Sequence, residues 1–186
     1  MGRIFYLADP HFCHENIVKG CARPFPDAAS MTEAMLAAWR ARVSPDDAVY
    51  LLGDLFVRPK HPLSVLTRLT GRLTLIRGNH DDEWLREIDP SDYFENVADE
   101  AEILDGGRLV RMCHLPRPDW IPETGYLLHG HLHNSPPRSE SWRAACARPN
   151  VLNVGADIAF SAGILAPAVL EDWIRINEDW KADHPL

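Results

Sequence analysis

Positive charge is scarce in this sequence. Its 186 residues include 19 Lys and Arg against 27 Asp and Glu, the formal net charge is −8, and the basic residues form no run. Proteins that enclose long nucleic acids depend on many cationic contacts to phosphate. The charge balance therefore predicts no long nucleic-acid partner and disfavours a DNA-processing nuclease.

Long apolar runs are also missing. The longest uncharged stretch, near Ile158 to Leu170, contains Pro167 and is too short to span a bilayer. The only apolar stretch before Asp9 is Ile4 to Ala8, which lacks the basic region and apolar length of a secretory signal. We therefore expect a cytoplasmic protein with no membrane partner.

Cysteine is sparse and unpaired in the sequence. The four residues, Cys13, Cys21, Cys113 and Cys146, form no C-x-x-C motif. In a chain without a secretory signal, scattered thiols are typical of reduced side chains that act as small buried apolar groups. The sequence therefore predicts no disulfide framework.

The composition that is present suits a compact enzyme. With 46% hydrophobic residues, residues 1–186 are expected to form a single domain with a substantial core. Strand-like and helix-like patterns alternate along the chain. Ser30 and Glu33 resemble a capping box that starts a helix over Met31 to Val43. The tract Asn134 to Pro149 is interpreted as a loop because it is rich in proline and polar residues.

Five apolar stretches each run directly into residues that can bind a metal ion or sit beside one. Strands that end this way would bring their ends to one edge of a sheet and build a polar pocket from distant residues. The stretches and their polar ends are IFYLA into Asp9 and His11, VYLLG into Asp54, LTLIRG into Asn79 and His80, LVRMC into His114, and YLLHG into His131 and His133.

The spacing of these residues predicts the direction in which their side chains point. Asp9 and His11 are two apart, as are the last two histidines, so each pair points to one side of the backbone if strand geometry persists. Asn79 and His80 are adjacent and would point apart, so one could bind metal while the other faces a substrate. Glycines stand directly before Asp54, Asn79 and His131, where a missing Cβ permits a sharp exit from the strand.

The candidate ligands are too many for one ion. A catalytic zinc typically uses three protein ligands, whereas seven candidates are present here. A carboxylate can bridge two ions about 3.5 to 4 Å apart. At that separation two ions can stabilise both the attacking and the leaving oxygen of a displacement at phosphorus. We therefore expect two divalent ions, held by Asp9, His11, Asp54, Asn79, His114, His131 and His133.

Taken together, these motifs resemble the calcineurin-like metallophosphoesterases. The ordered blocks are DPH at 9–11, GD at 53–54, GNHD at 78–81, a lone His114 and GHLH at 130–133. The amino-terminal DPHFCHENIV and RPF segments look most like those of small bacterial and phage-type phosphoesterases. The resemblance implies an α/β fold of two packed mixed β-sheets flanked by helices, an αββα sandwich.

The resemblance also implies roles for the site residues. One ion would be held by Asp9, His11, Asp54 and His133, and a second by Asp54, Asn79, His114 and His131, with Asp54 as the bridge. His80 would donate a proton or stabilise the transition state near the leaving group. Imidazole, carboxylate and amide ligands suit manganese, iron, zinc or nickel, and manganese is the favoured ion.

The implied activity is a metal-dependent phosphoesterase in which metal-bound hydroxide attacks phosphorus and His80 assists the leaving group. Leu55 follows Gly53 and Asp54, where the family's protein phosphatases have an acid and then an arginine, so that activity is not expected. The same difference leaves the partner of His80 open, either Asp81 or none. The acidic balance favours a small phosphodiester or nucleotide substrate.

Two alternatives to this enzyme are a non-catalytic scaffold of the same fold and a nucleic-acid-processing nuclease. Scaffolds tend to lose site histidines, which are present here. Oligomeric state, and monoester, diester or pyrophosphate preference, stay open.

Several residues beside the blocks have two interpretations. His14 could contact substrate or make a hydrogen bond at a helix start. Arg23 could bind a phosphate oxygen or serve as a surface anchor. Trp120 and Trp142 could line a base-stacking pocket or simply pack under loops.

Overall fold

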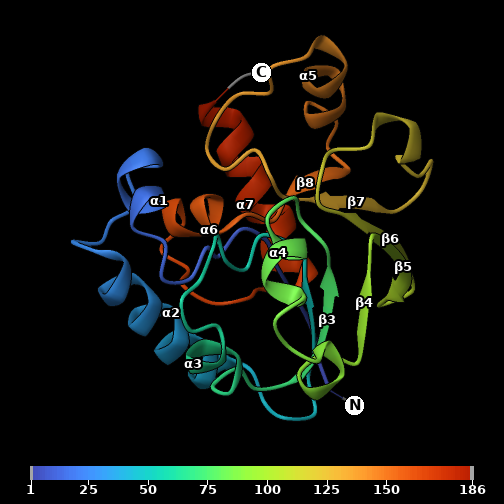
Figure 1. Cartoon of the computed structure of the whole chain (residues 1–186). Coiled ribbons are helices and arrows are strands. Elements are labelled where there is room, and N and C mark those ends of the chain that lie inside the picture. Colours follow the sequence, from blue (N-terminus) through green and yellow to red (C-terminus); the bar gives the residue numbers. More distant parts are fainter. Residues whose placement is uncertain (1, 185–186) are drawn as a thin grey trace.

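The computed structural model describes residues 2–184, which form two four-stranded sheets with flanking helices (Figure 1). The first sheet has the order β1-β2-β3-β4 and the second β5-β6-β7-β8. The strands are β1 (Ile4–Leu7), β2 (Ala48–Leu51), β3 (Arg72–Ile76), β4 (Asn96–Ala98), β5 (Glu100–Asp105), β6 (Arg108–Cys113), β7 (Tyr126–His129) and β8 (Val151–Asn153). This arrangement confirms the predicted fold class.

Strand direction differs between the sheets. All three pairings within β1 to β4 are parallel, with Leu7 opposite Leu51 and Leu51 opposite Leu75. In the second sheet β5 and β6 are antiparallel, whereas β6, β7 and β8 run parallel. Parallel strands place their carboxyl ends at one edge, so each of the five predicted polar ends shares an edge with a parallel neighbour by topology alone.

The two sheets meet just beyond β1 and β8. The amide N–H of Ala8 donates to the carbonyl oxygen of Val154 at 2.8 Å, and Ala8 pairs with Gly155 in a parallel bridge. One hydrophobic core contains residues of both sheets, including Leu7, Leu75 and Met112. The carboxyl ends of both sheets therefore face one region.

Helices cover this double sheet, and the three helices between residues 15 and 66 lie together on one side of it in Figure 1. The helices are α1 (Glu15–Gly20), α2 (Ala28–Arg42), α3 (Leu63–Leu66), α4 (Asp81–Leu85), α5 (Glu140–Cys146), α6 (Ala156–Ser161) and α7 (Leu170–Asp183), with short 3-10 turns η1 (Pro90–Asp92) and η2 (Pro118–Trp120). Helix α7 packs against both β1 and β8. Within residues 2–184, no helix is long and apolar enough to cross a membrane.

Two local predictions were wrong. Helix α2 begins three residues early because the carboxylate of Asp27 accepts the N–H of Ser30 at 2.7 Å, so Asp27, not Ser30, is the cap. Glu33 pairs with Arg68 instead of closing a capping box. The tract 134–149 is not all loop: α5 lies within it, capped by the Ser139 hydroxyl, which accepts the N–H of Trp142 at 3.2 Å.

The cysteines are free thiols, but only two of them are buried. Cys113 and Cys146 are buried as predicted, whereas Cys21 is partly buried and Cys13 is exposed. The prediction of burial was therefore wrong for Cys13. The positive φ of Cys13 (61°) belongs to the turn that follows β1, which carries it outward.

Candidate metal centre

The structure brings all seven predicted metal ligands to the edge where the carboxyl ends of both sheets meet. Each follows the end of a strand: two follow β1, one each follows β2, β3 and β6, and two follow β7. The amide N–H of His131 donates to Asp9 Oδ2 at 2.8 Å, which links residues 122 positions apart in the sequence. The topology therefore assembles the cluster that the sequence pattern indicated.

The backbone that carries these ligands is not extended. Five of them have left-handed φ values: 53° at Asp9, 47° at His11, 54° at Asp54, 68° at His131 and 50° at His133. Strand alternation therefore does not explain why the paired residues converge, contrary to the sequence argument. Such conformations in residues with a Cβ cost of order 1 kcal/mol or more each and concentrate at functional sites.

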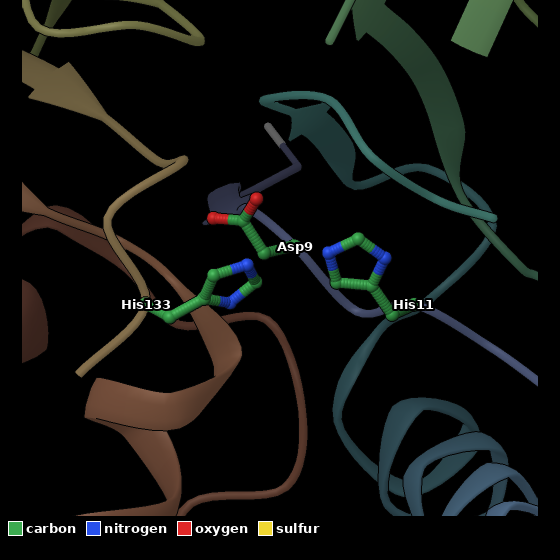
Figure 2. Close-up of side chains that lie close together, drawn as sticks. All are labelled: Asp9, His11 and His133. Carbon is green, nitrogen blue, oxygen red and sulfur yellow. The ribbon is translucent and has the colours of Figure 1, made fainter. Parts of the chain in front are cut away.

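A first cluster consists of Asp9, His11 and His133, whose ligand atoms all lie within 4.8 Å of one another. Figure 2 shows these three side chains converging from two separate segments of the chain. Both ring nitrogens of His11 and the Oδ1 atom of Asp9 are buried and have no hydrogen-bond partner among the described residues. Buried polar atoms without partners are costly. A cation here would satisfy Asp9 Oδ1 and one nitrogen of His11, because an imidazole ring binds an ion through one nitrogen only.

A second cluster consists of Asp54, His114 and His131, again with ligand atoms within 4.8 Å. The Oδ1 atom of Asn79 lies 3.1 Å from His114 Nε2 and joins this group. The other nitrogen of His114, Nδ1, lies 2.8 Å from the carbonyl oxygen of Leu52. That contact fits a donated N–H, which leaves Nε2 as the nitrogen able to bind metal.

Asp54 lies between the two clusters. Its Oδ2 atom is 3.5 Å from His114 Nε2 and 3.9 Å from His11 Nε2. Its Oδ1 atom accepts the backbone N–H of His80 at 2.9 Å, which fixes the carboxylate plane. One oxygen of Asp54 is therefore within reach of both sets of ligands.

Two glycines make room for this packing. A Cβ on Gly53 would lie 2.5 Å from His114 Nδ1, and φ at Gly53 is +83°. A Cβ on Gly78 would lie 2.2 Å from Asp54 Oδ1. Neither position has space for a side chain, as expected for a crowded centre.

Burial and neighbouring charges shift the pKa values of several residues in the centre. Burial raises the pKa of Asp9 to about 6 and lowers the pKa of His11 well below its ordinary value. Burial also acts against charge on Asp54 and His114, but their mutual attraction holds the pKa of Asp54 at about 2 and raises that of His114 to about 9, with Asp9 contributing. Without a cation, protons balance the buried carboxylates, and metal binding would displace them.

Asp157, which was not among the predicted site residues, contacts one of the predicted ligands. Its carboxylate lies 2.8 Å from His133 Nδ1 and accepts two hydrogen bonds at 2.9 Å from the guanidinium of Arg23. Burial opposes protonation of His133, but the contact with Asp157 raises the pKa of His133 above its ordinary value. A carboxylate behind a histidine orients the ring and strengthens it as a metal ligand.

Arg23 does not contact the cleft as a substrate ligand would. Its side chain is 0% exposed, and besides Asp157 it donates to the carbonyl oxygens of Pro10 at 2.7 Å and Asp9 at 2.8 Å. The surface-anchor interpretation was equally wrong. The guanidinium instead holds together the turn after β1 and the start of α6.

His14 lies beside the first cluster. Its ring is 5.7 Å from that of His11, and it makes no capping hydrogen bond at the start of α1. Its Nδ1 atom is buried without a partner among the described residues. The helix-start interpretation is therefore wrong, and a role toward substrate stays a prediction.

Asp81 is not the partner of His80. Its carboxylate accepts the backbone N–H groups of Asp54, Leu55 and Gly78 and the indole N–H of Trp84, at 2.8 to 3.1 Å. The side chain of His80 is 45% exposed, with Nε2 4.0 Å from Asp54 Oδ2. Asp81 therefore supports the two ligand loops, and His80 stands at the rim of the centre.

A cleft of about 600 Å³ opens over the second cluster. It is lined by residues of the centre and by the segment 135–142; those of the centre are Asp54, Asn79, His80, His131 and His133. Small-molecule sites typically occupy about 300 to 1,000 Å³. The candidate centre is thus accessible to a small ligand.

Comparisons with known proteins agree with this geometry. A family model described as calcineurin-like phosphoesterase matches residues 2–176. An uncharacterised protein of Methanocaldococcus jannaschii is 32% identical over 138 residues, covering 72% of this chain and 70% of that protein. The gene 66 protein of Mycobacterium phage L5 is 27% identical over 165 residues, covering 72% and 79%.

Among solved structures, a protein of unknown function from Aquifex aeolicus superimposes with a TM-score of 0.66. It is 24% identical, and the match covers 90% of this chain and 95% of that one. This superposition shows that the two proteins share a fold.

Proposed function

Because the chain belongs to the calcineurin-like phosphoesterase family and is a metal-dependent hydrolase of phosphoric esters, we propose that it holds two divalent ions and cleaves a small phosphodiester or nucleotide. One ion is assigned to Asp9, His11, Asp54 and His133, and the other to Asp54, Asn79, His114 and His131. No thiolate lies in either of these ligand sets. The oxygen ligands suit manganese and the imidazoles suit iron, zinc and nickel, and manganese is the ion that we propose first.

The observation that carries the two-ion proposal is the position of Asp54. Its Oδ2 atom lies within 4 Å of nitrogens from both clusters, at 3.5 Å from His114 and 3.9 Å from His11. A single oxygen in this position suits a bridge. In the first cluster, Asp9 and His11 have buried polar atoms without hydrogen-bond partners, which a bound cation would stabilise.

The proposed hydrolysis assigns separate roles to the bound ions and to His80. When bound, paired divalent ions lower the pKa of the attacking water and stabilise charge on the phosphoryl oxygens. His80 supplies the remaining group: its backbone N–H fixes Asp54, while its exposed ring lines the cleft. We assign to it protonation of the departing oxygen, a general-acid role.

The preference for a small substrate rests on size and charge. A cleft of about 600 Å³ suits a nucleotide-sized ligand. The net charge of −8 repels long polyanions, while a cationic centre still attracts a single phosphate group. Small diesters are therefore proposed over long nucleic acids and phosphoproteins.

A substrate panel tests the proposal. The protein is stripped of metal, reconstituted with Mn²⁺, Fe²⁺, Zn²⁺ or Ni²⁺, and assayed on bis(p-nitrophenyl) phosphate, cyclic nucleotides, nucleoside monophosphates, dinucleoside polyphosphates and long DNA. Small diesters or nucleotides should give the highest kcat/KM. Faster cleavage of long DNA at physiological salt would contradict the proposal, as would hydrolysis of none of the esters with any metal.

A further inference from the structure

The segment 135–142 forms a wall of the cleft that the metal chemistry does not use. Its lining residues include Arg138 and Trp142, which share the cleft with Asp54, Asn79 and His80. The wall is anchored: Ala145 and Cys146 of α5 are buried, and the guanidinium of Arg143 donates to the carbonyl oxygen of Pro137 at 3.1 Å. A fixed wall beside a phosphate site can select the organic part of the substrate.

Trp142 differs from the tryptophans of the core. Trp39, Trp84 and Trp173 are at most 1% exposed, and each donates its indole N–H to an oxygen of the protein. Trp142 is only partly buried, and its indole N–H has no acceptor within residues 2–184. Trp142 therefore lines the cleft and is not packed in the core as the other three tryptophans are.

The placement of Trp142 relates it directly to the second metal cluster. Its ring meets that of His131 edge to face, with centroids 6.0 Å apart and planes at 89°. The T-shaped contact covers at most one face of the indole, and the ring is only partly buried and lines the cleft. An aromatic group of a ligand bound at the centre can therefore stack on Trp142.

Arg138 supplies the only cationic side chain among the described residues that line the cleft. Most arginines of this chain form ion pairs with carboxylates, for example Arg68 with Glu33 and Arg111 with Glu102. The exposed guanidinium of Arg138 forms no ion pair in the part of the chain that the structure describes. In an acidic protein, an unpaired arginine beside a phosphate site suits an anionic ligand.

We propose that the wall is a nucleotide subsite, in which Trp142 stacks on the base and Arg138 binds the phosphate charge. This inference rests on the proposed function, because it places the ester phosphorus at the two-ion centre. It narrows the substrate class from small phosphate esters to nucleotides.

Two competing ligands separate the two contacts. Adenosine 5′-monophosphate and ribose 5-phosphate share the sugar and the phosphate, but only the first has a base. Their inhibition constants are measured against hydrolysis of bis(p-nitrophenyl) phosphate by the metal-loaded protein, and their dissociation constants by calorimetry. Trp142→Ala should weaken the nucleotide about tenfold, because base stacking on an aromatic ring has that order of effect, and should leave ribose 5-phosphate unchanged. Trp142→Phe should restore most of the difference.

Arg138→Gln should weaken both ligands by a similar factor, because both carry the phosphate. Arg148→Gln is the matched control, since Arg148 lies just beyond α5 and outside the cleft. Trp180→Phe controls for loss of an indole elsewhere. Equal weakening of both ligands by Trp142→Ala, or no weakening of either, would overturn the base subsite.

The outcomes distinguish this inference from the function on which it rests. If no metal-loaded form hydrolyses any ester of the substrate panel, the proposed function fails, while calorimetry still compares the two ligands. If the reporter is hydrolysed but wild-type protein binds both ligands equally, the phosphoesterase stands and the nucleotide subsite is wrong.

Discussion

His133 Nδ1 lies 2.8 Å from the carboxylate of Asp157, a residue behind the centre that binds no metal in the proposed scheme. The contact selects the ring nitrogen that faces Asp9 and His11. The same carboxylate holds the buried guanidinium of Arg23. Asp157 therefore links the orientation of a ligand to the stability of the turns around it.

Asp157→Asn should lower metal affinity at the first site about tenfold to a hundredfold, as is typical when the partner of a metal-bound histidine is changed. The amide must choose between accepting from His133 and accepting from Arg23. Metal titration by calorimetry measures the loss. Asp157→Ala should instead destabilise the fold by about 3 to 5 kcal/mol, because it leaves the Arg23 charge buried and unpaired. Unchanged affinity in a folded Asp157→Asn protein would remove this role.

Asp81→Asn should impair both stability and metal binding, although Asp81 is not a proposed ligand. Its carboxylate accepts four N–H groups, three of them from the loops that carry Asp54 and Asn79. An amide nitrogen facing those donors costs about 1 to 3 kcal/mol. Thermal unfolding of the metal-free protein isolates this effect. An Asp81→Asn protein as stable as wild type would show that the four hydrogen bonds matter little.

His80→Ala should lower the rate of hydrolysis according to the leaving group. For alkyl or ribose leaving groups the loss should be about a hundredfold to ten-thousandfold, the range for a general acid. Nitrophenyl esters should be affected much less, because their anions leave without a proton. The comparison requires unchanged metal content. Equal losses for both ester types would instead indicate charge stabilisation or positioning by His80.

Asp47→Asn should destabilise the far end of the first sheet in a pH-dependent way. Burial acts to raise the pKa of Asp47, but N–H groups of Ser44 and Arg3 and the Arg3 guanidinium hold it below its ordinary value. A carboxyl group with a lowered pKa adds stability above its unfolded value, about 3.9, and loses it as the pH falls further.

Wild type should thus exceed Asp47→Asn by about 1 to 2 kcal/mol at pH 7. The gap should close below about pH 4, and denaturant unfolding at both pH values measures it. A gap that stays constant down to pH 3 would contradict the assignment.

Much of the centre could be predicted from the sequence because a few adjacent residues mark where each strand ends. Apolar runs that stop at Asp54, Asn79 or His114 specify both the strand and its polar end. Parallel pairing then brings those ends together. The blocks were specific because each depends on a few adjacent residues.

Other features depend on contacts that no local pattern records. Arg23 and Asp157 pair across 134 positions, so neither signals the other in the sequence. Asp157 follows VLNVGA, another apolar stretch that ends in an acid, and that signal could have found it. The backbone at Asp9 and His11 is left-handed, and their N–H groups donate to the carbonyl oxygens of Gly53 and Asp54 in another loop, so the alternation expected of a strand does not hold there.

Metal stoichiometry tests the central claim most directly. Metal-free protein is titrated with Mn²⁺, and bound ions per chain are counted after removal of excess metal. The account predicts two equivalents for wild type, about one for His114→Ala, and weakened binding at both sites for Asp54→Ala, since only Asp54 is shared. A wild-type protein that saturates at one ion, or an Asp54→Ala protein that still binds two with unchanged affinity, would contradict the two-ion centre.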